Sequence, residues 1–245
     1  MFRPAKGRMF TSVDYTVTLY QGCGTPGHPY ACPYGWCKAL GIPHAPELKI
    51  KDWANLVPSS IEEAVIFINS AHDWLAPVIP SDWILELLKW IGRQNPSLEF
   101  LLQSKWPLRA YDYPTFLEDV KDRVILATTI ETDSQEILNG IGCLASPITE
   151  RAYVMATFKS LGYRTRLSLE PLFKFNPKNM AEIIRQVGPE IIEIGLDNYS
   201  HRHHLKIPQP SPDDVQELIT RIAGLKPEPK VNLKTSIKEW LKREG

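Results

Sequence analysis

Three of the four cysteines in this 245-residue chain lie together in one loop. Cys23, Cys32 and Cys37 are separated by eight and then four residues, many of them glycine or proline. Thiolates are the usual protein ligands of iron–sulfur clusters. Three of them can hold three irons of a four-iron cluster and leave the fourth iron open to another ligand. The loop therefore predicts a metal centre.

Structural zinc is the alternative metal for this loop. Cys32 and Cys37 would form one ligand pair, joined by His28 or Cys143, but the second closely spaced pair of a typical zinc site is missing. Buried cysteines acting as small apolar residues are a third interpretation, and the glycines and prolines around them offer little apolar surface for it. Spacing alone favours a cluster over zinc only modestly.

Ionisable residues also recur at the ends of apolar runs along the rest of the chain. The run at 64–69 is continuous, as in a strand that is buried on both faces of a parallel sheet. The runs are followed by Asp73, Lys105, Glu131, Glu170 and Asp197. A single charge at a strand end is ordinary, but five in succession favour a shared site, because the carboxyl ends of parallel strands meet at one rim.

Strand-like and helix-like segments alternate through the chain. We expect strands at residues 14–20, 64–69, 98–103, 123–129, 163–169 and 190–196, and helices at 80–93, 113–120, 149–161, 179–187, 212–223 and 233–243. Six such units predict an α/β fold, specifically a partial (β/α)6 parallel barrel of the TIM type with the cysteine-bearing loop after its first strand.

The expected domain covers residues 1–225, with the cluster loop at 21–46. Residues 226–245 begin with Lys-Pro-Glu-Pro and are expected to form a linker and a C-terminal helix packed on that domain.

The composition argues against membranes and general polyanion binding. There are 28 basic and 28 acidic residues, so no overall field attracts the chain to nucleic acid or to an anionic membrane. No apolar run approaches the roughly 20 residues of a membrane span. We expect a cytoplasmic protein, in which clustered cysteines bind metal or take part in catalysis more often than they form disulfides.

The loop and the strand-end motifs together resemble the radical S-adenosylmethionine (radical SAM) superfamily. Within it they are similar to the branch that contains spore photoproduct lyase and phage and bacterial proteins of unassigned function. The similarity runs from about residue 15 to about residue 200, through Tyr-Gln-Gly-Cys at 20–23, Cys-Lys-Ala at 37–39, Asn-Ser-Ala-His-Asp at 69–73, Leu-Gln-Ser-Lys at 102–105, Thr-Ile-Glu at 129–131 and Leu-Ser-Leu-Glu-Pro-Leu at 167–172.

The resemblance implies a cofactor pair and a reaction. Cys23, Cys32 and Cys37 would ligate a [4Fe-4S] cluster whose open iron binds S-adenosylmethionine. Reductive cleavage would give a 5′-deoxyadenosyl radical that abstracts hydrogen from an unknown substrate. The electron would come from a donor such as flavodoxin or ferredoxin.

The resemblance also implies roles for other residues. Trp36 would lie near the adenine, Ser70 and Asp73 near the amino group of S-adenosylmethionine, and Lys105 near its carboxylate. Glu131 or Glu170 would reach the ribose hydroxyls or the substrate, and we place Asp197 among the cofactor-binding residues as well. An ion pair between Lys105 and Glu131 is an equally weighted alternative.

Cys143 has two interpretations. It is either a small buried residue or a hydrogen-atom donor, like the distant cysteine of spore photoproduct lyase.

The spacing of the cysteines departs from the superfamily pattern. The usual Cys-x3-Cys-x2-Cys is replaced by Cys-x8-Cys-x4-Cys. Either the two extra residues of the second gap bulge outward, or the cluster is absent and the site is reused, for example in a non-catalytic zinc-binding protein.

The polar, partly basic run at 198–206 is either a solvated loop or a contact to phosphates, as a DNA-lesion repair enzyme would need.

Overall fold

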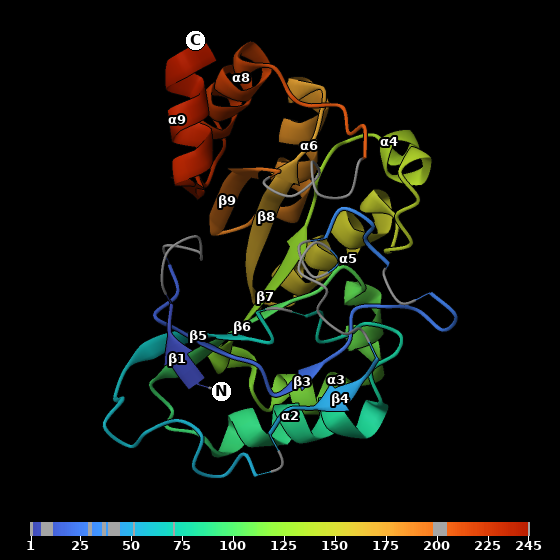
Figure 1. Ribbon diagram of the computed structural model, residues 1–245. Helices are drawn as coiled ribbons and strands as arrows, with labels where there is room; N and C mark the ends of the chain where they lie inside the picture. The colour runs from blue at the N-terminus through green and yellow to red at the C-terminus, as the bar shows by residue number, and fades with distance from the viewer. Residues whose placement is uncertain are drawn as a thin grey trace.

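The structure is a computed structural model of the chain (Figure 1). It describes residues 2–5, 12–28, 31–35, 38, 45–50, 52–70, 72–197 and 205–244. Trp36, Cys37 and residues 198–204 of the polar loop lie outside these ranges, so the predictions made for them are not addressed by the structure.

A sheet of eight strands, mostly parallel, forms the centre of the fold. Its order is β1-β2-β5-β6-β7-β8-β9-β10, and only β1 and β2 pair in the antiparallel sense. The strands are β1 (Phe2–Pro4), β2 (Tyr15–Val17), β5 (Ala64–Ile68), β6 (Leu98–Gln103), β7 (Val124–Thr129), β8 (Arg164–Leu172), β9 (Ile191–Leu196) and β10 (Lys230–Leu233). The predicted α/β class is confirmed, and the six predicted strands correspond to β2 and β5 to β9.

The prediction for the C-terminal segment is wrong in part. The expected helix is present as α9 (Thr235–Glu244), but β10 precedes it and pairs in parallel with β9. Residues 230–233 thus belong to the sheet. The strand was not predicted because its four residues are too short a run to stand out in the sequence, and because the prolines at 227 and 229 suggest a linker.

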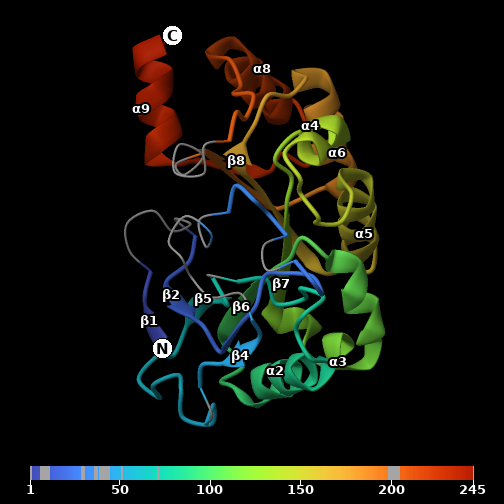
Figure 2. The same cartoon turned by 45° about the vertical axis from the view of Figure 1, so that its right-hand side comes forward.

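Helices cover one face of this sheet. Figures 1 and 2 show α2 (Ser81–Arg93), α3 (Pro114–Glu118), α5 (Ile148–Ser160) and α6 (Pro177–Val187) following one another along that face, with α8 (Pro212–Ala223) beyond them. In α2, apolar residues at helical spacing turn inward, including Ile84, Leu87 and Ile91. The main core lies between these helices and the strands. Among the described residues, no helix is long and apolar enough to cross a membrane.

The other face of the sheet is divided. A small apolar cluster covers β5 to β7, whereas β8 and β9 present buried polar residues such as Arg166 and Glu193. The hydroxyl of Ser12, just before β2, donates to Glu193 and accepts from Arg166, both at 2.9 Å. Strands β2 and β9 are far apart in the sheet order, so this contact requires a strongly curved sheet. Within the described chain, β1 and β10 remain the edge strands.

The cysteine loop is anchored by a second, two-stranded sheet. β3 (Tyr20–Gln21) and β4 (Glu47–Leu48) pair in the antiparallel sense and hold the two ends of the loop together. Just beyond β3, Thr25 and His28 exchange backbone hydrogen bonds across a turn with Pro26 and Gly27 at its centre. Gly27 is the third residue of this turn and has a φ of 79°, as the third position of a type II β-turn requires. These two elements organise a loop that has little apolar content of its own.

Candidate functional site

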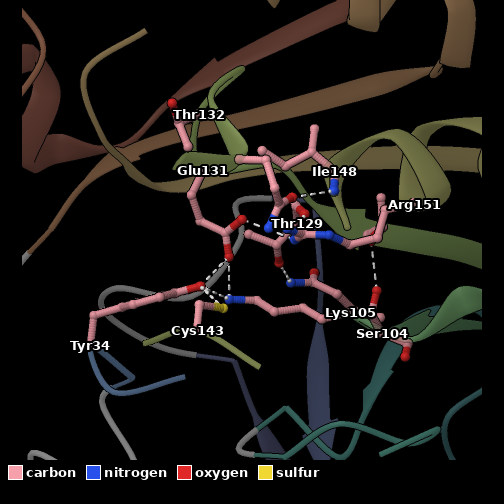
Figure 3. A network of polar contacts seen from close by, with 12 residues as sticks. Tyr34, Ser104, Lys105, Thr129, Glu131, Thr132, Cys143, Ile148 and Arg151 are labelled. Carbon is pink, nitrogen blue, oxygen red and sulfur yellow. Dashed lines mark hydrogen bonds and ion pairs between the residues drawn. The ribbon is translucent and has the colours of Figure 1, made fainter. Parts of the chain in front are cut away.

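Glu131, which follows β7, is the centre of a buried charged cluster (Figure 3). Its side chain is fully buried. Lys105 Nζ lies 2.5 Å from Oε1, Arg151 Nη1 lies 2.9 Å from Oε2, and the Tyr34 hydroxyl donates to Oε1 at 2.5 Å. Burial alone would raise the pKa of Glu131, but Arg151 and then Lys105 outweigh it and lower the pKa to about 2. The carboxylate is therefore ionised at neutral pH.

The ion pair between Lys105 and Glu131, weighed in the sequence as an alternative, is confirmed. Lys105 Nζ also donates to the Tyr34 hydroxyl at 3.0 Å and lies 4.7 Å from the centre of its ring. Burial lowers the pKa of Lys105, but the nearby Cys32 and Glu131 more than compensate, so the pKa is raised overall. Lys105 is thus a permanent cation between the cysteine loop and the strand ends.

Two members of this cluster were missed in the sequence. Arg151, on α5, is fully buried and also donates to the carbonyl of Thr129. In the sequence it resembles an ordinary charge on an exposed helix face, and no local signal marks it. Tyr34 is also buried, and its ring packs edge-on against Phe173 with centroids 5.0 Å apart.

Tyr34 lies in the widened second gap of the cysteine motif, between Cys32 and Cys37. Of the two alternatives for this gap, outward bulging does not describe Tyr34, because its side chain is directed inward and reaches Glu131. The signal available in the sequence was a large aromatic residue in an otherwise Gly- and Pro-rich loop.

Cys143 is brought to the same cluster. Its Sγ lies 3.6 Å from the Tyr34 hydroxyl. The interaction with the Cys32 thiol lowers the pKa of Cys143 to about 6, against the effect of burial, while the same interaction, followed by burial, raises the pKa of Cys32 well above its ordinary value. The pair thus favours the thiolate form at Cys143 and the thiol form at Cys32.

Backbone geometry fixes Cys143 in this place. Helix α4 (Gln135–Gly140) ends with Gly142 in the left-handed region at a φ of 73°, while Cys143 N donates to Leu138 O and Gly142 N to Asn139 O. This is the Schellman arrangement, in which glycine is favoured because it adopts positive φ without strain. Cys143 follows the glycine and is directed back toward the core.

Asp73 is buried and joins the ends of β5 and β6. Its carboxylate accepts from the Ser104 hydroxyl at 2.7 Å and from the backbone N–H groups of Lys105 and Leu75 at 2.6 and 2.9 Å. Burial raises its pKa, while these hydrogen bonds oppose the rise. Its neighbour Ser70 is half-buried in the same loop.

Asn69, which no sequence argument singled out as a site residue, supports the base of the cysteine loop. It is fully buried with a φ of 50°, and its Oδ1 accepts from the backbone N–H groups of Leu19 and Tyr20. It thus links the end of β5 to the strand segment that leads into Cys23, which is half-buried.

Glu170 belongs to a different ion pair. It pairs with Lys234, which directly follows β10, and the carboxylate folds over Gly195 of β9. Burial raises the pKa of Glu170, and Lys234 opposes the rise. Asp197, just after β9, is half-buried. Of the predicted strand-end residues, Asp73 and Lys105 thus lie with Glu131, whereas Glu170 pairs with Lys234 in a second group.

The metal prediction concerns three thiols, of which the structure describes two. In the described ranges, no group of three or more histidine, cysteine or acidic side chains is arranged to hold a metal, and Cys37 is not part of those ranges. Cys23 and Cys32 have the thiol chemistry that an iron–sulfur cluster needs. Both are half-buried, and the cation of Lys105 lies close to Cys32. The donor set described so far is compatible with an anionic cluster.

Comparisons with known proteins support the fold. No family model matches the chain. An uncharacterized protein, ORF301 of Acidianus two-tailed virus, is 25% identical over 190 residues, which are 69% of this chain and 61% of that protein. The chain therefore spans less than two thirds of the length of this relative.

Solved structures of spore photoproduct lyase match over nearly the whole chain. A Cys-to-Ala variant with dinucleoside spore photoproduct gives a TM-score of 0.66 at 11% identity, over 93% of this chain and 79% of that one. A Tyr-to-Phe variant gives a TM-score of 0.62 at 11% identity, over 92% and 78%. At this identity the likeness concerns the fold alone: the chain folds like spore photoproduct lyase, as its motifs predict.

Proposed function

We propose that the protein is a radical SAM enzyme whose substrate is not yet known. The observation that carries the proposal is that the cysteine loop packs, through Cys32 and Tyr34, onto a charged cluster at the strand ends of a fold like that of spore photoproduct lyase. In this proposal the curved sheet is a partial (β/α)6 barrel. A cytoplasmic location and an electron donor such as flavodoxin or ferredoxin belong to the same proposal.

Cys23, Cys32 and Cys37 would hold the [4Fe-4S] cluster. With S-adenosylmethionine bound, that cluster supplies the carbon-centred radical chemistry of the superfamily, while the protein binds, orients and excludes solvent. Trp36, Ser70 and Asp197 are proposed to contact S-adenosylmethionine.

The structure refines what the charged residues would do. The carboxylate of Asp73 already accepts three hydrogen bonds from neighbouring residues, one of them from the backbone N–H of Lys105. We therefore propose that Asp73 positions the Lys105 backbone as well as binding the amino group of S-adenosylmethionine. Lys105, Arg151 and Glu131 together carry one net positive charge beneath the loop. Such a charge stabilises an anionic thiolate-bound cluster and tunes its potential.

Cys143 is proposed as the hydrogen-atom donor, with the Tyr34 hydroxyl as its neighbour. The geometry that supports this is their 3.6 Å contact inside the charged cluster. Glu170, in the second group with Lys234, is proposed to face the substrate.

The test is anaerobic reconstitution of the full chain with iron and sulfide. The expected product is a brown protein with about four irons and matching sulfide that releases 5′-deoxyadenosine from S-adenosylmethionine after chemical reduction. The Cys32→Ser variant, with one ligand fewer, should lose both properties. A folded wild-type chain with no cluster absorption would refute the proposal, and about one tightly bound zinc per chain would establish the zinc-binding alternative.

A DNA-lesion lyase is a second candidate. It is supported by the fold likeness to a protein solved with dinucleoside spore photoproduct. Its test is binding of DNA that weakens steeply with salt. Unchanged affinity between low and high salt, or no binding at all, would argue against it.

A further inference from the structure

Cys32 and Cys143 come from distant parts of the sequence and lie beside a backbone contact between their two segments. Leu144 N donates to Ala31 O at 2.7 Å, so the two segments are held together directly beside the two cysteines. The two thiols are also near enough for each to shift the pKa of the other. A disulfide bridges residues whose Cα atoms are about 4.4–6.8 Å apart, and each of these cysteines is the immediate neighbour of one of the two hydrogen-bonded residues.

Each cysteine is also fixed by its own segment. Cys143 follows the left-handed Gly142 that ends α4, and its N–H donates to Leu138 O at 2.9 Å. Cys32 begins a turn in which its carbonyl accepts from Gly35 N at 2.9 Å. Both cysteines therefore lie in segments whose backbone is held by hydrogen bonds within the fold.

We propose that Cys32 and Cys143 form a reversible disulfide that closes the metal loop when no cluster is bound. The proposal rests on the proposed function in one respect, namely that Cys32 is a cluster ligand. A sulfur in a disulfide has no thiolate to offer to iron. The bond would therefore hold the loop in a state that cannot accept a cluster until it is reduced.

The oxidant is a small-molecule disulfide such as oxidised glutathione. One protein thiolate attacks a sulfur of the small disulfide and expels a thiolate, which gives a mixed disulfide. The second protein thiolate then attacks the protein sulfur of that intermediate and expels the other small thiolate. In total, two protein thiols lose their protons and two electrons, and the small disulfide is reduced to two thiols.

Peptide mapping tests the pairing. The full chain, purified without iron and checked for folding by circular dichroism, is oxidised with glutathione disulfide, alkylated and digested with trypsin under non-reducing conditions. Cys143 lies in the fragment 124–151 and the other three cysteines lie in the fragment 9–38. We expect these two fragments to be joined in most of the oxidised chain and to separate after reduction.

Variants identify the partner of Cys143 and provide matched controls. Cys23→Ser and Cys37→Ser should keep the link between the fragments, whereas Cys32→Ser and Cys143→Ser should lose it. A link that survives in Cys32→Ser, a bond confined to the fragment 9–38, or stable glutathione adducts in place of the link would each overturn the proposal.

A second measurement uses thermal unfolding. The bond would close a loop of more than 100 residues in the unfolded chain, so the melting temperature of the oxidised wild type should rise by about 5–15 °C over the reduced form. The Cys143→Ser chain should show no such rise, and an equal rise there would contradict the pairing.

Iron uptake separates this proposal from the proposed function. We expect the oxidised wild type to take up iron and sulfide only after reduction. If the reduced chain takes up no iron while the link maps to Cys32 and Cys143, the cluster proposal fails and the disulfide stands. If the oxidised and linked chain takes up iron as readily as the reduced chain, the disulfide does not control the loop.

Discussion

Replacement of Glu131 by glutamine tests the charged cluster most directly. The change keeps the size of the side chain but removes the carboxylate that, among the described residues, pairs with both Lys105 and Arg151. Two cations would then remain buried or half-buried without their counter-ion. Breaking a buried ion pair by removing one partner typically costs about 3–5 kcal/mol, so we expect Glu131→Gln to lower the free energy of unfolding by that amount at pH 6.

The pH dependence of stability gives a second magnitude for the contribution of the ionised Glu131 carboxylate. The pKa of Glu131 falls from an ordinary value of 4.5 to about 2 in the folded protein. Each tenfold change in proton affinity is worth about 1.4 kcal/mol, so the ionised carboxylate contributes about 3 kcal/mol. Because the folded pKa is depressed, this stabilisation is complete above pH 4.5 and is lost as the pH falls toward 2. By the same relation, about 1.4 kcal/mol of it is lost between pH 6 and pH 3.5.

Urea unfolding followed by circular dichroism at these two pH values measures both quantities. The wild type should lose about 1.4 kcal/mol more than Glu131→Gln between pH 6 and pH 3.5. Glu63→Gln is the control, because Glu63 is an exposed carboxylate and its replacement should cost less than about 0.5 kcal/mol. Equal acid sensitivity of the wild type and Glu131→Gln, or a Glu131→Gln stability within that margin at pH 6, would refute the electrostatic account.

Substitutions at three further positions test other features of the site by the same unfolding assay. Tyr34→Phe removes a hydroxyl that donates to the Glu131 carboxylate and should cost about 1.5–3 kcal/mol; a neutral result would mean that the contact contributes nothing. Gly195→Ala places a Cβ 3.0 Å from Cδ of Glu170 and should lower the free energy of unfolding by about 1–3 kcal/mol; an unchanged stability would show that the Glu170 side chain moves aside at no cost. Asn69→Gly should be more stable than Asn69→Ala by about 1 kcal/mol, because residue 69 has a positive φ; the reverse order would contradict this.

Much of the sheet could be predicted because its strands leave a strong signal. Buried parallel strands are rich in apolar residues; β5 is an uninterrupted apolar run, and β6, β7 and β9 are mostly apolar. β10 has only four residues and follows two prolines, so neither length nor composition marked it. The contact from Ser12 to a strand far along the chain, which accompanies the curvature of the sheet, is encoded by no local pattern.

The site could be predicted to the level of strand ends, and no further. Topology alone brings Asp73, Lys105 and Glu131 to one rim, so their residue types and positions were sufficient. Whether Lys105 and Glu131 pair with each other or bind a ligand depends on side chains from other segments of the chain. Arg151 comes from a helix and does not differ in the sequence from an ordinary surface arginine. Tyr34 comes from the loop, where its large aromatic side chain was the one available signal.

Glu170 was grouped with Glu131 for the same reason. Both follow apolar strands, but in the structure Glu170 is separated from that cluster by its pairing with Lys234. Lys234 comes just after β10, the strand that the sequence did not reveal. An error in one short strand therefore carried over into the description of the site.

The wide cysteine spacing takes on another meaning once Tyr34 is considered. One of its two additional residues can be used as a tether, since the Tyr34 hydroxyl fastens the loop to residues that follow β6 and β7 and, through Glu131, to a helix beyond them. A loop with the shorter spacing has less chain with which to reach that depth. The longer gap thus connects the loop to the sheet through side-chain contacts, and we expect a displacement of the backbone at Cys32 to change the environment of Lys105 and Arg151.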